Sequence, residues 1–197
     1  GLTSVSYDFY VRAKCSATEN SNWVGPINIA AVQAIDNSPA MMTANIDGTQ
    51  YDFMQPYLYS VTHNDVTVLN NGAPANEPRH LSIQGNTSDN LITLKEINLY
   101  IPSTKFAAGT YTLFEKEGFE NIDFCQAHLI IAPGSANSTY CDITSGTITI
   151  TEFNLATKRV KGTFSFVYEK SINGDPVGTF EVTNGTFTYG LDHSYFN

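Results

Sequence analysis

The chain has 197 residues and a mass of 21.6 kDa, a length typical of one domain. Ten basic residues against nineteen acidic ones give a net charge of −9, which excludes the basic surface on which nucleic-acid binding depends. With 15% charged and 42% hydrophobic residues, the composition is that of a globular domain rather than a disordered chain or a coiled coil.

The N-terminal part is less regular than the rest. Residues 1–40 include a turn-rich stretch around Trp23, and we expect them to form an extension packed on a single β-rich domain that spans residues 1–197. The chain opens at Gly1 without the basic and apolar regions of a signal sequence, so we expect any export signal to have been removed. Its apolar runs are too short for a membrane-spanning helix.

Residues 41–53 predict a tight β-hairpin. Apolar residues alternate with polar ones over residues 42–46, and aromatic residues alternate over 51–53. Between these runs stands Asp47-Gly48, a typical two-residue hairpin turn. Further short strands are predicted near 66–68, 81–83, 91–101 and 111–114.

Helical patterns are scarce. A short helix is expected within 103–108, and one helical turn within 115–122. Neither window carries an apolar stripe of three turns, so neither predicts a longer helix. The chain also lacks a strand-helix-strand rhythm, which argues against a parallel sheet with a nucleotide-binding crevice.

The C-terminal third predicts antiparallel strands. Isoleucine alternates with threonine over 147–151, so this strand should have one buried face and one solvent-exposed face. Residues 160–168 form a second strand, joined to the first through residues 154–159. The only basic cluster, residues 158–161, is expected to lie at the surface of that turn. Asn184-Gly185 fits either a hairpin turn or a bulge in a continuing strand.

Together these elements predict an all-β fold. We expect an antiparallel two-sheet β-sandwich with few short helices, and a partly closed lipocalin-like barrel is the alternative.

No catalytic motif is present. The nucleophile elbow G-x-S-x-G and the glycine-rich phosphate loops are missing, and the four histidines lack metal-ligand spacing. The acidic cluster over 115–123 is interpreted as a solvated loop. We therefore assign no catalytic, cofactor-binding or metal-binding residue and expect a protein that is not an enzyme. A hydrolase would need carboxylates or histidines assembled in space.

Two further features leave alternatives open. Cys125 and Cys141 stand 16 residues apart, so adjacent strands could join them in a disulfide, or both could be buried free thiols. Residues 45–48 contain a fragment of a calcium-loop pattern without its terminal glutamate. A turn explains this fragment, and a weak surface calcium site is the alternative; no other cofactor is expected.

Aromatic residues are the candidates for ligand binding. Tyr57 and Tyr59 are two positions apart, so on a strand they would share one face. With Trp23 they are candidates for stacking against a sugar, and the alternative is that they fill the core.

Several segments resemble an uncharacterised family of envelope lipoproteins from Bacteroidota, of the Bacteroides and Cytophaga type. The resemblance rests on residues 42–51, 92–94, 109–113, 146–154, 158–166 and 182–187, in matching order and spacing. It covers about residues 41–189. Asn154 stands where that family often has Asp.

The resemblance implies a β-rich envelope protein of unknown function. It further implies export by a lipoprotein signal and a lipidated cysteine upstream of Gly1, which would anchor the protein at the periplasmic or outer-membrane surface. It supplies no catalytic residues. The only membrane contact expected is through this anchor.

Three hypotheses about function follow. The first is a non-enzymatic lipid-anchored envelope protein whose sandwich binds a glycan or another envelope protein. The second is a lipocalin-like carrier with a small apolar ligand inside a closed barrel. The third is the hydrolase with a spatially assembled site.

Overall fold

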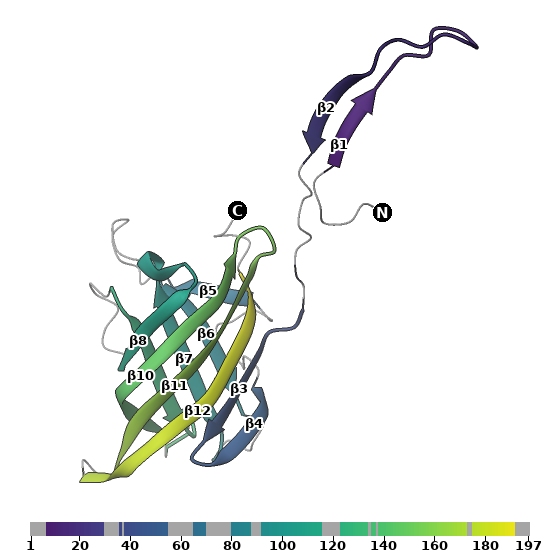
Figure 1. Ribbon diagram of the computed structural model, residues 1–197. Coiled ribbons are helices and arrows are strands. Elements are labelled where there is room, and N and C mark those ends of the chain that lie inside the picture. Colours follow the sequence, from purple (N-terminus) through teal and green to yellow (C-terminus); the bar gives the residue numbers. More distant parts are fainter. Residues whose placement is uncertain are drawn as a thin grey trace. The chain divides into compact units, whose positions relative to one another are not determined.

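The computed structural model describes residues 7–29, 36, 38–54, 65–69, 80–87, 92–115, 123–133, 135–136, 138–172 and 175–191 (Figure 1). The chain divides into two compact units, Gly1–Ile35 and Asp36–Asn197. That residues 1–40 pack on the remainder as part of a single domain stays a prediction.

The first unit contains a two-stranded antiparallel sheet. β1 (Tyr7–Val11) pairs with β2 (Val24–Ile29), and Tyr7 stands opposite Ile29. Several of its large hydrophobic side chains, among them Tyr10, Trp23 and Val24, are exposed. Such a hairpin is marginally stable by itself.

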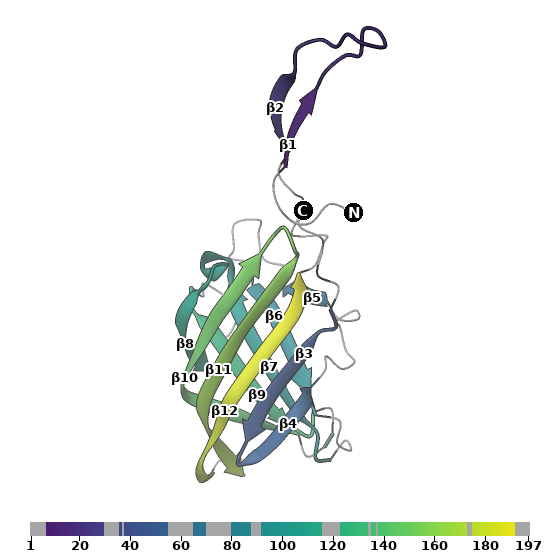
Figure 2. The same ribbon diagram turned by 45° about the vertical axis from the view of Figure 1, so that its right-hand side comes forward.

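The second unit is built on a single sheet, whose strands Figures 1 and 2 show wrapping round a common interior. In chain order the strands are β3 (Met41–Ile46), β4 (Thr49–Met54), β5 (Asp65–Leu69), β6 (His80–Asn86), β7 (Lys95–Pro102), β8 (Gly109–Glu115), β9 (Cys125–Ile131), β10 (Thr139–Asn154), β11 (Arg159–Ile172) and β12 (Asp175–Leu191). A 3-10 helix, η1 (Ser103–Lys105), follows β7.

The strand order closes the sheet into a nearly complete barrel. The order is β11-β10-β8-β9-β7-β6-β5-β12-β3-β4, and β11 also pairs with β12. β12 pairs with β3 between Val182 and Thr188 and with β5 at Gly190 and Leu191. The pairings of β12 with β5 and of β8 with β9 are parallel, and the other pairings of this sheet are antiparallel.

The predicted all-β class is confirmed, and the architecture combines features of a barrel and a sandwich. β3 also lies against β6, where Gly85 leaves room for the Met42 side chain. A Cβ atom at position 85 would lie 2.6 Å from the Met42 Sδ. A larger residue than glycine would therefore push the two strands apart.

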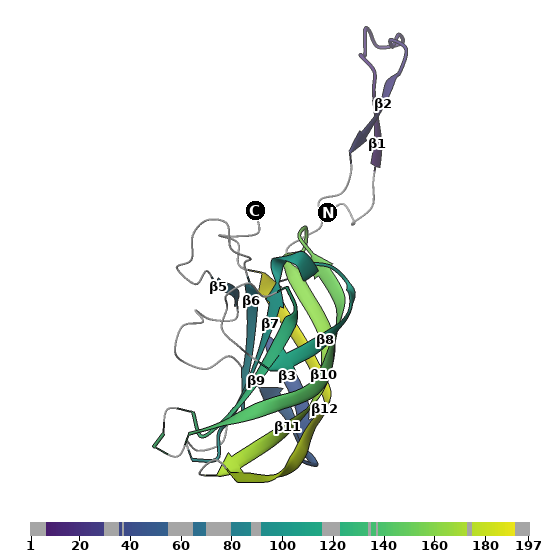
Figure 3. The ribbon, with the colours of Figure 1, turned by 90° about the vertical axis from the view of Figure 1, so that its left-hand side faces the viewer.

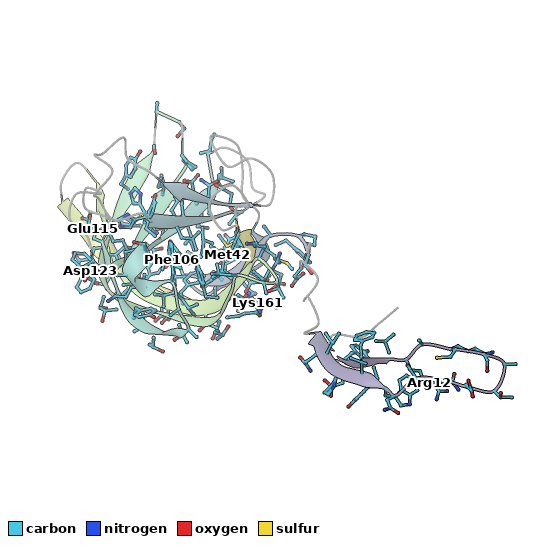
Figure 4. All side chains as sticks on the ribbon, turned by 90° about the horizontal axis from the view of Figure 1, so that it is seen from above. Arg12, Met42, Phe106, Glu115, Asp123 and Lys161 are labelled. Carbon is cyan, nitrogen blue, oxygen red and sulfur yellow. The ribbon has the colours of Figure 1, made fainter. Side chains whose placement is uncertain are left out.

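Apolar side chains fill the interior. Buried residues of β3, β4 and β6 to β12 make one continuous core, with Met42, Leu99 and Phe187 among its members. Figure 4 looks down on the barrel and shows Met42 among the side chains of the interior and Lys161 at the outer edge. An interior filled by these side chains gives no support to the carrier hypothesis.

Several predicted local features are confirmed. Asp47 and Gly48 form the turn between β3 and β4, both with positive φ, as a two-residue hairpin requires. Residues 155–158 form the turn between β10 and β11. Of the two interpretations of Asn184-Gly185, the bulge holds, because β12 continues through a register shift between Thr183 and Thr186.

The proposed disulfide does not form, because Cys125 and Cys141 are both buried free thiols. Cys141 stands opposite Leu129 on β9. Leu129 is four residues beyond Cys125, or about 13 Å along an extended strand. A disulfide needs Cα atoms within about 7 Å, so the register keeps the two sulfur atoms apart.

Arg159 contradicts the prediction that the basic cluster 158–161 lies at the surface of the turn. Its side chain is only 1% exposed. The guanidinium donates hydrogen bonds to the carbonyl oxygens of Ser38 at 2.5 Å and Pro39 at 3.0 Å, and to the Thr188 hydroxyl at 3.0 Å. It thereby ties the segment before β3 to the barrel wall.

In the part of the chain that the structure describes, no helix combines the length and hydropathy needed to cross a membrane.

Candidate functional site

Five neighbouring strands present a polar, uncharged surface on the outside of the barrel. These strands are β3, β12, β11, β10 and β8, which lie side by side in that order (Figures 1 and 2). Successive side chains on a strand point to opposite sides. Because the apolar residues of each strand point into the core, the intervening residues face outward.

The antiparallel registers align one threonine from each strand into a rank. Its members, from β3 to β8, are Thr43, Thr186, Thr163, Thr149 and Thr110. Hydrogen bonds of 2.8 Å and 2.9 Å join the hydroxyls at the two ends, between Thr43 and Thr186 and between Thr110 and Thr149.

A second rank runs beside the first, two residues along β3, β11, β10 and β8 and three residues along β12, which contains the bulge. Its members are Asn45, Thr183, Ser165, Thr147 and Thr112. Ser165 faces the β12 bulge, since Phe164 pairs with Gly185 and Phe166 pairs with Val182. We call these two ranks together the hydroxyl face.

Shallow grooves lie along the middle of the hydroxyl face. Their linings include Thr147, Thr149, Thr163, Ser165, Thr183 and Thr186. In a sheet, neighbouring strands are about 4.8 Å apart and alternate residues on one strand about 6.8 Å apart. The hydroxyls therefore repeat at roughly these two spacings across the grooves.

The core beneath holds the hydroxyl face in place. Gly162 of β11 stands opposite Ile150 of β10, and a Cβ atom there would collide with the Thr149 carbonyl oxygen and the Phe187 ring. A Cβ atom at Gly185 would lie 2.6 Å from ring carbons of Phe164. These two glycines let the aromatic rings pack close under the strands, so the face rests on a tightly filled layer.

Charged residues lie beside the hydroxyl face rather than on it. Lys161 and Glu152 form a 2.9 Å ion pair next to the first rank, and Glu181 lines the far end of the grooves. Although the chain carries a net charge of −9, neither rank contains a charged side chain.

The hydroxyl face has the chemistry of binding rather than of catalysis. Each threonine offers a hydroxyl that both donates and accepts hydrogen bonds, next to a methyl group. The two ranks contain no carboxylate, histidine or cysteine, so they supply no nucleophile with a neighbouring base and no general acid. The hydrolase hypothesis gains no support from them.

The role of the aromatic residues predicted to bind sugar stays a prediction. Tyr57 and Tyr59 lie outside the described residues. Trp23 belongs to the N-terminal unit, where it is 60% exposed, and the Arg12 guanidinium lies 4.6 Å from the centroid of its ring. Its stacking against a ligand stays a prediction.

The residues around the predicted calcium fragment interact with each other. The Asp47 carboxylate accepts hydrogen bonds from the Tyr168 hydroxyl at 2.7 Å and from Lys170 Nζ at 3.2 Å. Burial, followed by the hydrogen bond to Asp47, raises the pKa of Tyr168, which keeps this phenol protonated as a donor. The described residues contain no group of three or more His, Cys, Asp or Glu side chains that could hold a metal ion.

Sequence reasoning missed the hydroxyl face, although one signal for it was present. The alternating threonines of residues 147–151 predicted a wet strand face, and the structure confirms it. The alignment of threonines from five strands depends on registers and bulges that the pattern of a single strand does not contain.

Comparisons with known proteins place the chain in a family. The profile of a domain of unknown function, DUF6252, matches residues 69–190. This range includes the β8, β10 and β11 parts of the hydroxyl face and nearly all of β12. No curated protein and no solved structure matches the chain. The chain belongs to the DUF6252 family, whose function is unknown.

Proposed function

We propose that this protein is a glycan-binding module of the cell envelope and that the hydroxyl face holds a neutral polysaccharide strand. The observation that supports this function is the alignment of hydroxyl side chains in two ranks across five strands, over shallow grooves. Polysaccharides carry hydroxyls at regular intervals, and each of these both donates and accepts a hydrogen bond.

The charge distribution supports a neutral ligand. The chain has a net charge of −9, which would repel acidic polymers. The hydroxyl face itself carries no charge, so it would not repel a neutral polymer. The hydroxyls are hydrated before the ligand binds, so each new hydrogen bond contributes little net free energy of binding. We therefore expect dissociation constants from micromolar to millimolar.

The proposed location rests on the resemblance to Bacteroidota envelope lipoproteins. A lipid anchor upstream of Gly1 would hold the module at the periplasmic or outer-membrane face. The metabolic labelling of the full-length precursor with a fatty-acid analogue tests this anchor, and a precursor that takes up no label contradicts it.

A charge substitution in the middle of the grooves tests glycan binding. Thr163 and Thr179 are both exposed strand residues, and only Thr163 belongs to the ranks. Neutral β-glucan, α-glucan and mannan would be titrated calorimetrically into the wild type, Thr163→Lys and Thr179→Lys. We expect one neutral polymer to bind, about tenfold more weakly to Thr163→Lys and with unchanged affinity to Thr179→Lys. Equal binding by all three proteins would contradict the proposed site.

The N-terminal hairpin favours a second candidate function, the binding of an envelope protein. Phe9, Tyr10, Val11 and Trp23 are all more than 40% exposed, and exposed apolar clusters are typical of protein interfaces. A photo-crosslinking residue in place of Trp23, in cells, should then give an adduct with one defined partner. If crosslinks from position 23 form no discrete adduct, this candidate fails.

A further inference from the structure

The N-terminal hairpin has an open edge along β1. β1 and β2 run side by side as a two-stranded sheet (Figures 1 and 3), so among the described residues the outer edge of each strand pairs with no other strand. β2 contains Pro26, which has no N–H group to donate, and a proline blunts the edge on which it lies. β1 contains no proline. It is therefore the edge that can accept a further strand.

The two faces of the hairpin differ in chemistry. On one face Asp8 stands opposite Asn28, and the Asn28 side-chain amide donates a 2.8 Å hydrogen bond to the Asp8 carboxylate. The other face carries two apolar pairs, Phe9 with Ile27 and Val11 with Val24. These four side chains are between 42% and 64% exposed. Exposed apolar clusters of this kind mark surfaces that bind a partner.

The hairpin unit is electrically neutral, although the chain is acidic. The charged residues of Gly1–Ile35 are Asp8, Glu19, Arg12 and Lys14, so their charges cancel. The net charge of −9 therefore belongs to the other unit. Two copies of the hairpin can approach each other without net electrostatic repulsion between them.

The charges along β1 are complementary to those of a second copy of β1. Asp8 stands two positions before Tyr10 and Arg12 two positions after it. When two copies of β1 pair antiparallel about a two-fold axis at Tyr10, residue 8 of each copy stands opposite residue 12 of the other. Both contacts then bring Asp8 against Arg12 on the same face of the sheet, and opposite charges in this position stabilise strand pairing.

The same register also joins the apolar faces of the two hairpins. Phe9 of one copy stands opposite Val11 of the other, on the face away from Asp8. Together with the pairings inside each hairpin, this gives a row of four apolar side chains across four strands: Ile27 and Phe9 from one copy, then Val11 and Val24 from the other. The two-fold axis repeats the row. A two-stranded hairpin is marginally stable, whereas three or more strands with an apolar face form a stable sheet.

We propose that the N-terminal hairpin pairs with a second copy of this chain, edge to edge along β1, in a four-stranded antiparallel sheet. The two-fold axis lies at Tyr10, and the two contacts between Asp8 and Arg12 determine the register. This inference rests on the second candidate function, in which the hairpin is a protein-binding surface, and it names the partner as another copy of the chain.

The oligomeric state of the full chain is the first test. Sedimentation equilibrium would be measured over a wide range of concentration, with a reductant present because Cys15 is exposed and can link two chains. We expect a reversible equilibrium between monomer and dimer. A wild-type chain that stays monomeric up to about 1 mM would overturn the proposal.

Two charge reversals then locate the interface. Asp8→Arg places two arginines opposite each other at each contact, and Arg12→Asp places two carboxylates there. Each variant alone should dimerise at least tenfold more weakly than the wild type, because like charges directly opposite each other destabilise strand pairing. An equimolar mixture of the two variants has opposite charges at both contacts, so it should dimerise about as tightly as the wild type. A mixture that associates no more than its components would overturn the proposed register.

Glu19→Arg and Lys14→Asp are the matched controls. They change the charge of the hairpin by the same amounts, at exposed positions outside the contacts between Asp8 and Arg12. Both should dimerise as the wild type does. Lys14→Asp also tests an axis shifted to Val11, because Asp8 would then face Lys14. Controls that weaken the dimer as much as the variants of Asp8 and Arg12 would overturn the proposal.

The photo-crosslinking residue at position 23 separates this proposal from the function on which it rests. An adduct with twice the mass of the monomer supports both. A monomeric chain that gives a discrete adduct with another protein keeps the second candidate function and overturns the second copy as the partner. A monomeric chain that gives no discrete adduct and sediments with phosphatidylcholine vesicles assigns the surface to a lipid bilayer and overturns both.

Discussion

The Arg159 guanidinium donates a 2.5 Å hydrogen bond to the Ser38 carbonyl oxygen across a sequence separation of 121 residues. A second hydrogen bond from the same guanidinium goes to the Pro39 carbonyl oxygen. One buried side chain thus satisfies two backbone carbonyls of the segment before β3. It fixes the point at which the chain joins the barrel.

Removal of this guanidinium should destabilise the barrel. Arg159→Met keeps much of the aliphatic stem but leaves the Ser38 and Pro39 carbonyl oxygens without their donor, so we expect a loss of about 2 to 4 kcal/mol in the free energy of unfolding. Urea denaturation of the full chain measures it. Lys161→Met is the control, because Lys161 is 41% exposed and its ion pairs should contribute less than about 1 kcal/mol.

Asp36 should make stability depend on acid pH. Hydrogen bonds from the Ser38 side chain and backbone, together with the nearby Arg159 and Lys161 charges, lower the pKa of Asp36 below its ordinary value. Its ionised form therefore stabilises the folded state above the unfolded pKa of about 4, and this contribution disappears as the pH falls through the lower folded value. Asp36→Asn should unfold at a lower temperature than wild type at pH 6, with a smaller difference near pH 3. A constant difference would contradict this.

The close packing under the hydroxyl face predicts a cost for one added methyl group. In Gly162→Ala the new Cβ atom would meet the Thr149 carbonyl oxygen and the Phe187 ring, and neither can move without disturbing the strands. We expect a loss of about 1 to 3 kcal/mol in the free energy of unfolding. Thr163→Ala, at the adjacent exposed position, should change it by less than about 0.5 kcal/mol. Equal effects of the two substitutions would contradict the close packing around Gly162.

The three thiols should differ sharply in reactivity. Burial raises the pKa of Cys125 to about 12 and that of Cys141 to about 11, so almost no thiolate exists at pH 8. Cys15 is exposed. Reaction of the native protein with Ellman's reagent should give one fast thiol, and two more only after denaturation. Three fast thiols, or a single thiol after denaturation without reductant, would contradict this assignment.

The fold class and many local elements could be predicted from the sequence because their causes are local. The turn at Asp47-Gly48 needs residues that tolerate positive φ, and the period-two pattern of 147–151 needs one buried face. The role of Arg159 could not be predicted, because its acceptors stand about 120 residues away. A basic residue beside a turn is ordinarily solvated, and only the tertiary fold places this one inside.

The candidate site shows the same limit. The ranks of threonines need the registers of five strands, and those registers include a bulge at Asn184 that the sequence left as one of two alternatives. The sequence left a disulfide and free thiols as alternatives for Cys125 and Cys141 for a related reason, since spacing along the chain does not determine register.

Binding of a glycan at the hydroxyl face would change the surroundings of its threonine methyl groups. The protein would be labelled at threonine methyl groups and titrated with the neutral glycan that binds best, while methyl chemical shifts are recorded. If the glycan binds in the grooves, the perturbed signals should belong to Thr147, Thr149, Thr163, Thr183 and Thr186, and those of Thr18 and Thr179 should stay unchanged. Perturbations elsewhere, with these five signals unmoved, would contradict it.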